Sequence, residues 1–250
     1  MAGRVSGRTL AAIFAHPDDE TFATGGTLAR LSAAGVRCVL YCATDGDAGR
    51  SSGLGVSSRA ELGRVRRAEL LAAGRSLGIT AVRHGGHADG ALGQVDADAL
   101  VGEIVDFIRE HRPDVVLTFG PEGAPTAHRD HRAISRAATA AFFLAGMEHA
   151  HPEQLAAGRA PHRASRLYYA TWEPPPSEGV PVPRGLPVSA RLVLGDALLD
   201  AKRRAYEAHR SQHELRARFE ELAMKPEELY HLAAGTPQPQ RIVDDLFAGL

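Results

Sequence analysis

The chain has 250 residues, of which 44% are hydrophobic and 24% are charged, and its formal net charge is −1. This balance is that of an ordinary globular protein, and the length suffices for one large domain. A nearly neutral charge gives no support for a nucleic-acid partner, which usually shows as a basic excess. We find neither an apolar run that could span a bilayer nor a signal segment, so we expect a cytoplasmic protein.

The first third of the chain alternates between strand and helix patterns. A strand at Leu10–Phe14 leads into a helix from about 20 to 34, and a second strand is expected at Val36–Cys42. A capping box at Ser58 opens a helix to about residue 77, and a third strand follows at Ala81–Arg83. Parallel strands joined by helices are the structure that such an alternation indicates.

The second strand carries the only two cysteines, Cys38 and Cys42. A strand rises ~3.3 Å per residue, which puts their Cα atoms about 13 Å apart, whereas a disulfide needs roughly 7 Å or less. We therefore expect two buried free thiols, as a reducing compartment would allow.

The alternation continues into the second half. A helix with one apolar face ends near His111, and Asp114–Phe119 is an unbroken β-branched run of the kind found in strands buried on both faces. A helix at about 131–147 and a fifth strand at Leu167–Trp172 follow. From about residue 196 to 250, the tail reads as a helical extension that covers one side.

These elements predict one α/β domain over residues 1–250. We expect a Rossmann-like, doubly wound, mostly parallel sheet with helices on both faces and the strand order 3-2-1-4-5. In that order the first and fourth strands are neighbours, and ligands bind outside their carboxyl ends. A proline-rich stretch, 173–187, is interpreted as a surface loop that could act as a lid.

Polar side chains gather at both of these strand ends. The segment FAHPDDE, Phe14–Glu20, follows the first strand, and GPEGAPTAHRDHRA, 120–133, follows the fourth. Carboxylates at a helix N-terminus are favoured for electrostatic reasons alone, so the first cluster by itself is weak evidence. Two such clusters at neighbouring strand ends together predict a shared site.

The residue types of these clusters predict a metal centre. Catalytic zinc takes three protein ligands and keeps one position for water. His16 and Asp19 can face one point from the first cluster, and His131 can complete the set from the second. Asp18 points differently from Asp19 and is free to act as the base.

The sequence resembles the LmbE-like, PIG-L family of zinc-dependent N-deacetylases. The matching segments are AHPDDE, TGGTLA, RRAELLAAGRSLG, DG at Asp89–Gly90, PDVVLTF, HRDH and KRRAYEAHRSQ. The resemblance extends over nearly the whole chain. The resemblance implies a metal-dependent N-deacetylase or amidase that acts on a small N-acetylated substrate of the N-acetylglucosamine type. Related proteins are often homo-oligomers.

On the matching positions, the resemblance implies a role for each polar residue. His16, Asp19 and His131 would bind zinc, and Asp18 would be the general base. His128 would stabilise the tetrahedral oxyanion and help to protonate the leaving amine.

Further residues would support these. Asp130 would hold a histidine in its working tautomer. Arg66 and Asp89 match positions near the substrate, although a solvated helix face and an ordinary turn explain them equally well. Thr126 takes the place of a tyrosine that several sugar-thiol members carry, and Arg129 replaces a usual proline, so both bear on substrate identity.

Two other functions are compatible with the same residues. Two histidines and one carboxylate also form the iron(II) triad of non-haem oxygenases, so the metal is zinc or Fe²⁺. A non-catalytic binding module of the same fold is the second, but the ligand set, base and oxyanion residue are all present. Among hydrolases, an amidase of a sugar-thiol conjugate is the alternative to a deacetylase.

Overall fold

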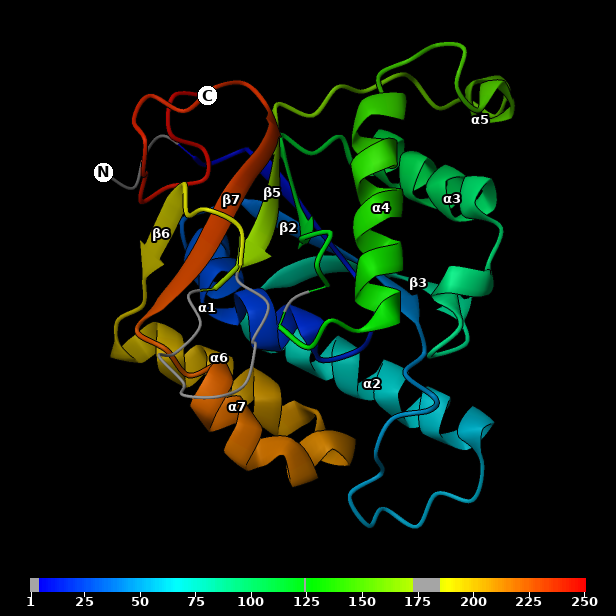
Figure 1. Cartoon of the computed structure of the whole chain (residues 1–250), viewed down its shortest axis with the longest axis vertical. Helices are drawn as coiled ribbons and strands as arrows, with labels where there is room; N and C mark the ends of the chain where they lie inside the picture. Colours follow the sequence, from blue (N-terminus) through cyan, green and yellow to red (C-terminus); the bar gives the residue numbers. More distant parts are fainter. Residues whose placement is uncertain (1–4, 124, 173–184) are drawn as a thin grey trace.

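The protein is described from a computed structural model over residues 5–123, 125–172 and 185–250. Within these residues, the strands form one seven-stranded sheet in the order β3-β2-β1-β4-β5-β7-β6 (Figure 1). The five parallel strands are β1 (Thr9–Phe14), β2 (Arg37–Thr44), β3 (Ile79–His87), β4 (Val115–Phe119) and β5 (Arg166–Thr171). The predicted order 3-2-1-4-5 is therefore confirmed.

Helices cover both faces of the sheet (Figure 1). The mutually packed helices on one face are α1 (Asp19–Ala33), α2 (Arg59–Leu77) and α6 (Asp196–Ala208), with α7 (Arg216–Leu222) beside them. On the other face lie α3 (Ala97–His111) and α4 (Arg129–Leu144), with the short α5 (Pro152–Ala156) nearby. Two 3₁₀ turns, Leu92–Gln94 and Arg210–Leu215, complete the helical elements of the described chain. None of the helices described is long and apolar enough to cross a membrane.

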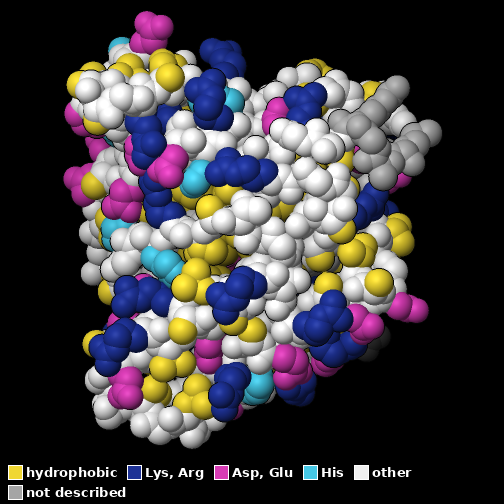
Figure 2. Space-filling view, turned by 180° about the vertical axis from the view of Figure 1, so that it is seen from behind, with side chains coloured by type: hydrophobic (Ala, Val, Ile, Leu, Met, Phe, Trp, Pro, Cys, Tyr) yellow, Lys and Arg dark blue, Asp and Glu magenta, His cyan; other side chains and the backbone are white. Residues whose placement is uncertain are grey.

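The surface carries charges of both signs. On the face shown in Figure 2, basic and acidic side chains are interspersed, with hydrophobic side chains between them. This pattern agrees with the formal net charge of −1. That face therefore lacks the one-signed stripe typical of nucleic-acid-binding surfaces.

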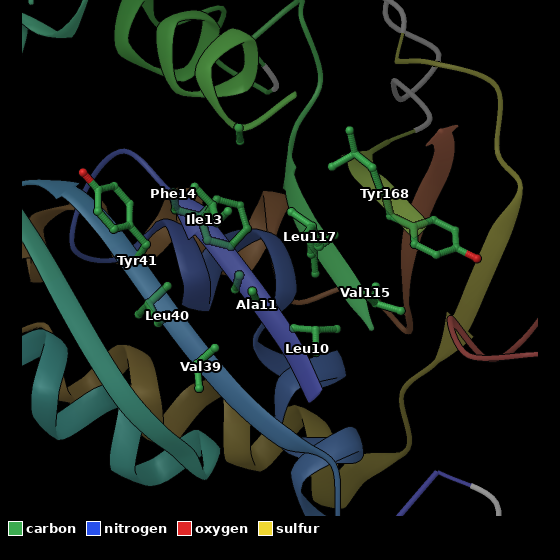
Figure 3. Close-up of a cluster of buried hydrophobic side chains, with 14 of the residues drawn as sticks. Leu10, Ala11, Ile13, Phe14, Val39, Leu40, Tyr41, Val115, Leu117 and Tyr168 are labelled. Atoms are coloured by element: carbon green, nitrogen blue, oxygen red, sulfur yellow. The ribbon is translucent and has the colours of Figure 1, made fainter. Parts of the chain in front are cut away.

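The core is built on the central strands (Figure 3). Leu10, Ile13 and Phe14 of β1 are fully buried, and Val115 and Leu117 of β4 are buried beside them. Burying each large apolar side chain contributes roughly 1.5–3 kcal/mol. Because helices cover both faces, these strands read as continuous apolar runs, which is why the sequence revealed them.

The prediction of a helical tail is wrong for residues 227–235. There β7 (Glu227–Gly235) inserts between β5 and β6 (Ala190–Val193) and is antiparallel to both. The strand was hidden because Glu228 occupies a buried position. Its carboxylate pairs with Lys202 Nζ at 2.6 Å, so a charged residue stands where strand patterns show an apolar one.

Both cysteines lie on β2 as free buried thiols, as predicted. Burial raises the pKa of the Cys38 thiol to about 12 and raises that of Cys42 well above its usual value. Neither group is a thiolate near neutral pH, so both act as small core side chains.

Candidate active site

The two polar clusters meet at the carboxyl ends of β1 and β4, which are paired in the sheet. After β1, the chain turns through His16 and Pro17, and α1 begins at Asp19. After β4, His128 caps α4, and Asp130 and His131 lie in its first turn. The sequence predicted this meeting, because neighbouring parallel strands end at the same edge of a sheet.

The buried carboxylate of Asp19 contacts two buried histidines, one through each oxygen. The Nδ1 atom of His16 is 3.3 Å from Asp19 Oδ2, and His131 Nε2 is 3.2 Å from Asp19 Oδ1. Donors about 2.0–2.1 Å from a tetrahedral metal lie roughly 3.3 Å apart, so these separations and this donor set fit zinc. The ring of Phe119 stacks on that of His131, 4.1 Å away, and supports its orientation.

The carboxylate of Asp19 is held in its ionised form. Its Oδ2 accepts hydrogen bonds from the backbone N–H groups of His16 (2.8 Å) and Ala15 (3.2 Å). Burial alone would raise the pKa of Asp19, but His131 and His16 outweigh it and lower the pKa well below its usual range. An ionised carboxylate at this position is what a metal ligand requires.

His16 is contacted on its other nitrogen by two more carboxylates. Its Nε2 lies 3.1 Å from Asp89 Oδ1 and 3.3 Å from Asp130 Oδ2. Asp130 is fully buried and also accepts the N–H groups of Gly90 (2.7 Å) and Leu92 (3.1 Å). A proton on Nε2 that faces these oxygens leaves the Nδ1 lone pair directed at Asp19.

The same contacts govern the charge of His16. Burial lowers its pKa, but Asp19, Asp130 and Asp89 together raise it well above the usual value in the metal-free protein. Asp130 thus contacts a histidine, and its role in holding the working tautomer stays a prediction. Asp89 lies closer to the cluster than its sequence context suggested, because Asp47 Oδ1 accepts its backbone N–H at 2.8 Å and fixes that turn.

Other combinations of donors are also close together. Within the described residues, nitrogen atoms of His16, His128 and His131 lie within 4.8 Å of one another, and so do donors of His16, Asp89 and Asp130. His16 belongs to both groups, so the cluster has its centre at this residue.

Asp18 directly precedes the proposed ligand Asp19, and Arg66 contacts its carboxylate. The Nη2 atom of Arg66 is 3.2 Å from Asp18 Oδ2 and also donates to the carbonyl of Pro17, while Nη1 donates to the carbonyl of Gly46 at 2.8 Å. Burial raises the pKa of Asp18 to about 6, and the charge of Arg66 opposes that rise.

Arg66 is only 3% exposed, and its guanidinium contacts protein groups. The sequence could not reveal this arrangement, because a surface arginine and a buried one look the same at that helix position. The geometry favours a role in placing Asp18, and a direct contact with substrate stays a prediction.

His128 lies at the mouth of the cluster. Its ring meets that of His16 edge to face at 4.8 Å, and its Nδ1 accepts the backbone N–H of Asp130 at 3.2 Å. Burial, then the charges of His16 and His131, lower its pKa. A neutral ring that accepts at Nδ1 carries its proton on Nε2, where it can donate.

The remaining predicted residues lie outside this cluster. Thr126 is exposed in the turn before His128, and its contact with substrate stays a prediction. Arg129, the other substituted position, is exposed as the first residue of α4. Most of the proline-rich stretch, residues 173–184, lies outside the described residues.

Comparison with known proteins adds independent evidence. Residues 11–142 match the model of a family described as GlcNAc-PI de-N-acetylase, PIG-L. The chain is 33% identical over 249 positions to the 1D-myo-inositol 2-acetamido-2-deoxy-alpha-D-glucopyranoside deacetylase of Rhodococcus opacus, covering 83% of this chain and 82% of that protein. It is 31% identical over 302 positions to deacetylase 2 of the same name from Catenulispora acidiphila, covering 97% of each.

A solved structure shows the same fold. The N,N'-diacetylchitobiose deacetylase of Pyrococcus horikoshii superposes with a TM-score of 0.75 at 21% identity, over 90% of this chain and 83% of that one.

Proposed function

Because the chain belongs to the PIG-L family of GlcNAc-PI de-N-acetylases, we propose that it removes the N-acetyl group from a small amino-sugar conjugate in a metal-dependent hydrolysis. The observation that carries the proposal is the contact of the Asp19 carboxylate with His16 (3.3 Å) and His131 (3.2 Å), directly after Asp18 in the chain. A base next to a two-histidine, one-carboxylate set is the arrangement that metal-assisted amide hydrolysis needs.

The substrate class rests on the relatives. Both curated relatives compared above are named as deacetylases of an inositol-linked 2-acetamido sugar. An N-acetylglucosamine-type conjugate is therefore the first class to test here. Thr126 and the stretch 173–187 are the positions where we expect substrate selection.

His16, Asp19 and His131 would hold the metal, which we propose to be zinc. When bound there, it would supply a Lewis acid that polarises the acetyl carbonyl. Asp19 is already ionised, and His16 turns its Nδ1 to the site, so loading requires little reorganisation of these residues.

Asp18 would take the proton of the attacking water. Its pKa of about 6 leaves it ionised at neutral pH yet basic enough to accept a proton. Arg66 fixes the carboxylate through its 3.2 Å contact with Oδ2.

His128 would donate from Nε2 to the oxygen that gains charge, since its Nδ1 is engaged by Asp130 N–H. One such donor stabilises a transition state by roughly 3–4 kcal/mol. The departing amine must be protonated, and Asp18 can return the proton that it took.

Elemental analysis of protein purified without chelators, with His131→Ala and His128→Ala beside the native chain, tests the site. We expect near-stoichiometric zinc in the native protein and in His128→Ala, and loss of zinc in His131→Ala. Native protein should release free amine from N-acetylglucosamine conjugates, and His128→Ala should lose about 10²–10³-fold in kcat.

Other outcomes discriminate between the alternatives. Stoichiometric iron with no amine release would favour the oxygenase. Absence of metal in native protein, even after zinc is added, would overturn the proposed site and leave a binding module.

A further inference from the structure

A buried contact next to Asp18 joins the first helix to a residue in the C-terminal part of the chain. The imidazole of His209, which ends α6, lies 2.8 Å through its Nε2 from Oε1 of Glu20 in the first turn of α1. Both side chains are fully buried. From the sequence alone, His209 is interpreted as structural, because nothing near it in the chain completes a site.

Glu20 in turn holds the backbone of Asp18. Its Oε2 accepts the N–H of Asp18 at 3.0 Å, and its Oε1 also accepts the hydroxyl of Thr21 at 2.6 Å. The carboxylate therefore bridges His209 and the residue that we propose as the base.

The backbone of Asp18 needs such support. Its φ angle is 116°, in the left-handed region that residues other than glycine seldom adopt. Conformations of this kind persist only where surrounding contacts determine them, and they concentrate at functional sites. Arg66 constrains the same turn from the other side through the carbonyl of Pro17.

Among the described residues, Glu20 is the one hydrogen-bond partner of the His209 imidazole, since its Nδ1 is buried without a hydrogen bond. An aliphatic side chain would fill the space without leaving a buried polar atom unpaired. The benefit of a histidine here is its contact with Glu20.

We propose that His209 is a positioning residue: through Glu20 it fixes the Asp18 backbone and so aims the catalytic carboxylate. This inference rests on the proposed function for its kinetic consequence. The segment that supplies His209 is anchored independently, since Ser211 donates to Glu69 of α2 through its backbone N–H (2.8 Å) and its hydroxyl (2.6 Å).

The test compares His209→Leu, His209→Gln and Tyr230→Phe with the native protein. Tyr230→Phe is the matched control, because it removes buried hydrogen bonds to Thr27 in the middle of α1 (2.6 Å) and to Glu228 (3.1 Å) and leaves Glu20 untouched. We expect His209→Leu to lose about 10–100-fold in kcat with KM and zinc content unchanged. His209→Gln, whose amide N–H can reach Glu20, should recover most of that loss.

A second readout does not depend on activity. Hydrogen exchange of the segment 15–22 should accelerate in His209→Leu, because Asp18 N–H loses its fixed acceptor, and should match the native protein in Tyr230→Phe. If native protein releases no amine, the proposed function fails, and the exchange rates alone decide this inference. Native kcat and native exchange in a folded His209→Leu protein would overturn it.

Discussion

Asp18 is the residue on which the chemistry depends most directly. We propose it as the base and its neighbour Asp19 as the ligand, so a neutral isostere of Asp18 should remove the base and spare the metal. We expect Asp18→Asn to retain stoichiometric zinc and to lose about 10²–10⁴-fold in kcat, the usual contribution of a general base. Elemental analysis and amine release on the same preparation measure the two quantities.

A carboxylate at the opposite end of the sheet provides the control for this change. Asp114 contacts Arg8 and the backbone N–H of Thr9, far from the cluster, so Asp114→Asn should keep both zinc and kcat. Loss of zinc from Asp18→Asn would show that Asp18 is itself a ligand and that the ligand assignment is wrong.

At this scale, the sequence predicted residue types better than their partners. The spacing in HPDDE and HRDH predicted that His16, Asp19 and His131 lie close together, because strand ends and helix turns have fixed geometry. It could not show that Asp89 reaches His16, since that contact depends on how the 88–92 turn folds over the sheet. Nor could it connect His209 to Glu20 across 189 positions.

Helix α1 packs closely against the β6–α6 connection at Gly26. A Cβ on Gly26 would lie 2.4 Å from Leu194 Cδ1, and Leu194 is buried. We expect Gly26→Ala to lower the free energy of unfolding by about 1–3 kcal/mol, because overpacking outweighs the gain in helix propensity. Urea denaturation measures the change.

Two further variants separate the cost of the Leu194 clash from the gain in helix propensity. A Cβ added at Gly74 in α2 would have its nearest neighbour, Ile79 Cβ, at 3.6 Å, which is an ordinary van der Waals contact. Gly74→Ala should therefore be neutral or stabilising by up to about 1 kcal/mol. In a Leu194→Ala background, the cost of Gly26→Ala should vanish. An equal cost in both backgrounds would assign the effect to the α1 backbone instead of to Leu194.

Element prediction succeeded where local patterns match the final environment. The central strands β1 and β4 are almost continuously apolar because helices bury both of their faces. It failed at β7, where buried Glu228 is stabilised by Lys202 and by the backbone N–H groups of Gly26 and Thr27. Those partners come from distant elements, so no local pattern indicates them.

For the whole molecule, strand order is the link between sequence and site. The alternation predicted that β1 and β4 are neighbours, and that single inference brought two clusters more than 100 residues apart to one edge of the sheet, as in the pair His16–Asp130. The antiparallel extension by β7 and β6 leaves this site where the simpler five-stranded sheet would have put it.

The proposed ligands come from the segment after β1 and the segment after β4. Metal binding should therefore stabilise the folded state of the whole domain. A ligand at 1,000 times its Kd adds about 4 kcal/mol, which raises Tm on the order of 10 °C for a domain of this size. We expect zinc to produce such a rise in native protein and in His128→Ala, but not in His131→Ala. Thermal unfolding with and without zinc measures it.

The zinc-induced rise in Tm should depend on pH. Asp19, Asp130 and Asp89 together raise the pKa of His16 in the metal-free protein against the effect of burial, so protons and zinc compete for its Nδ1. The zinc-induced rise in Tm should therefore be smaller at pH 6 than at pH 8, because a ligand histidine must be neutral. A rise of equal size in His131→Ala would mean that zinc stabilises the protein from another site.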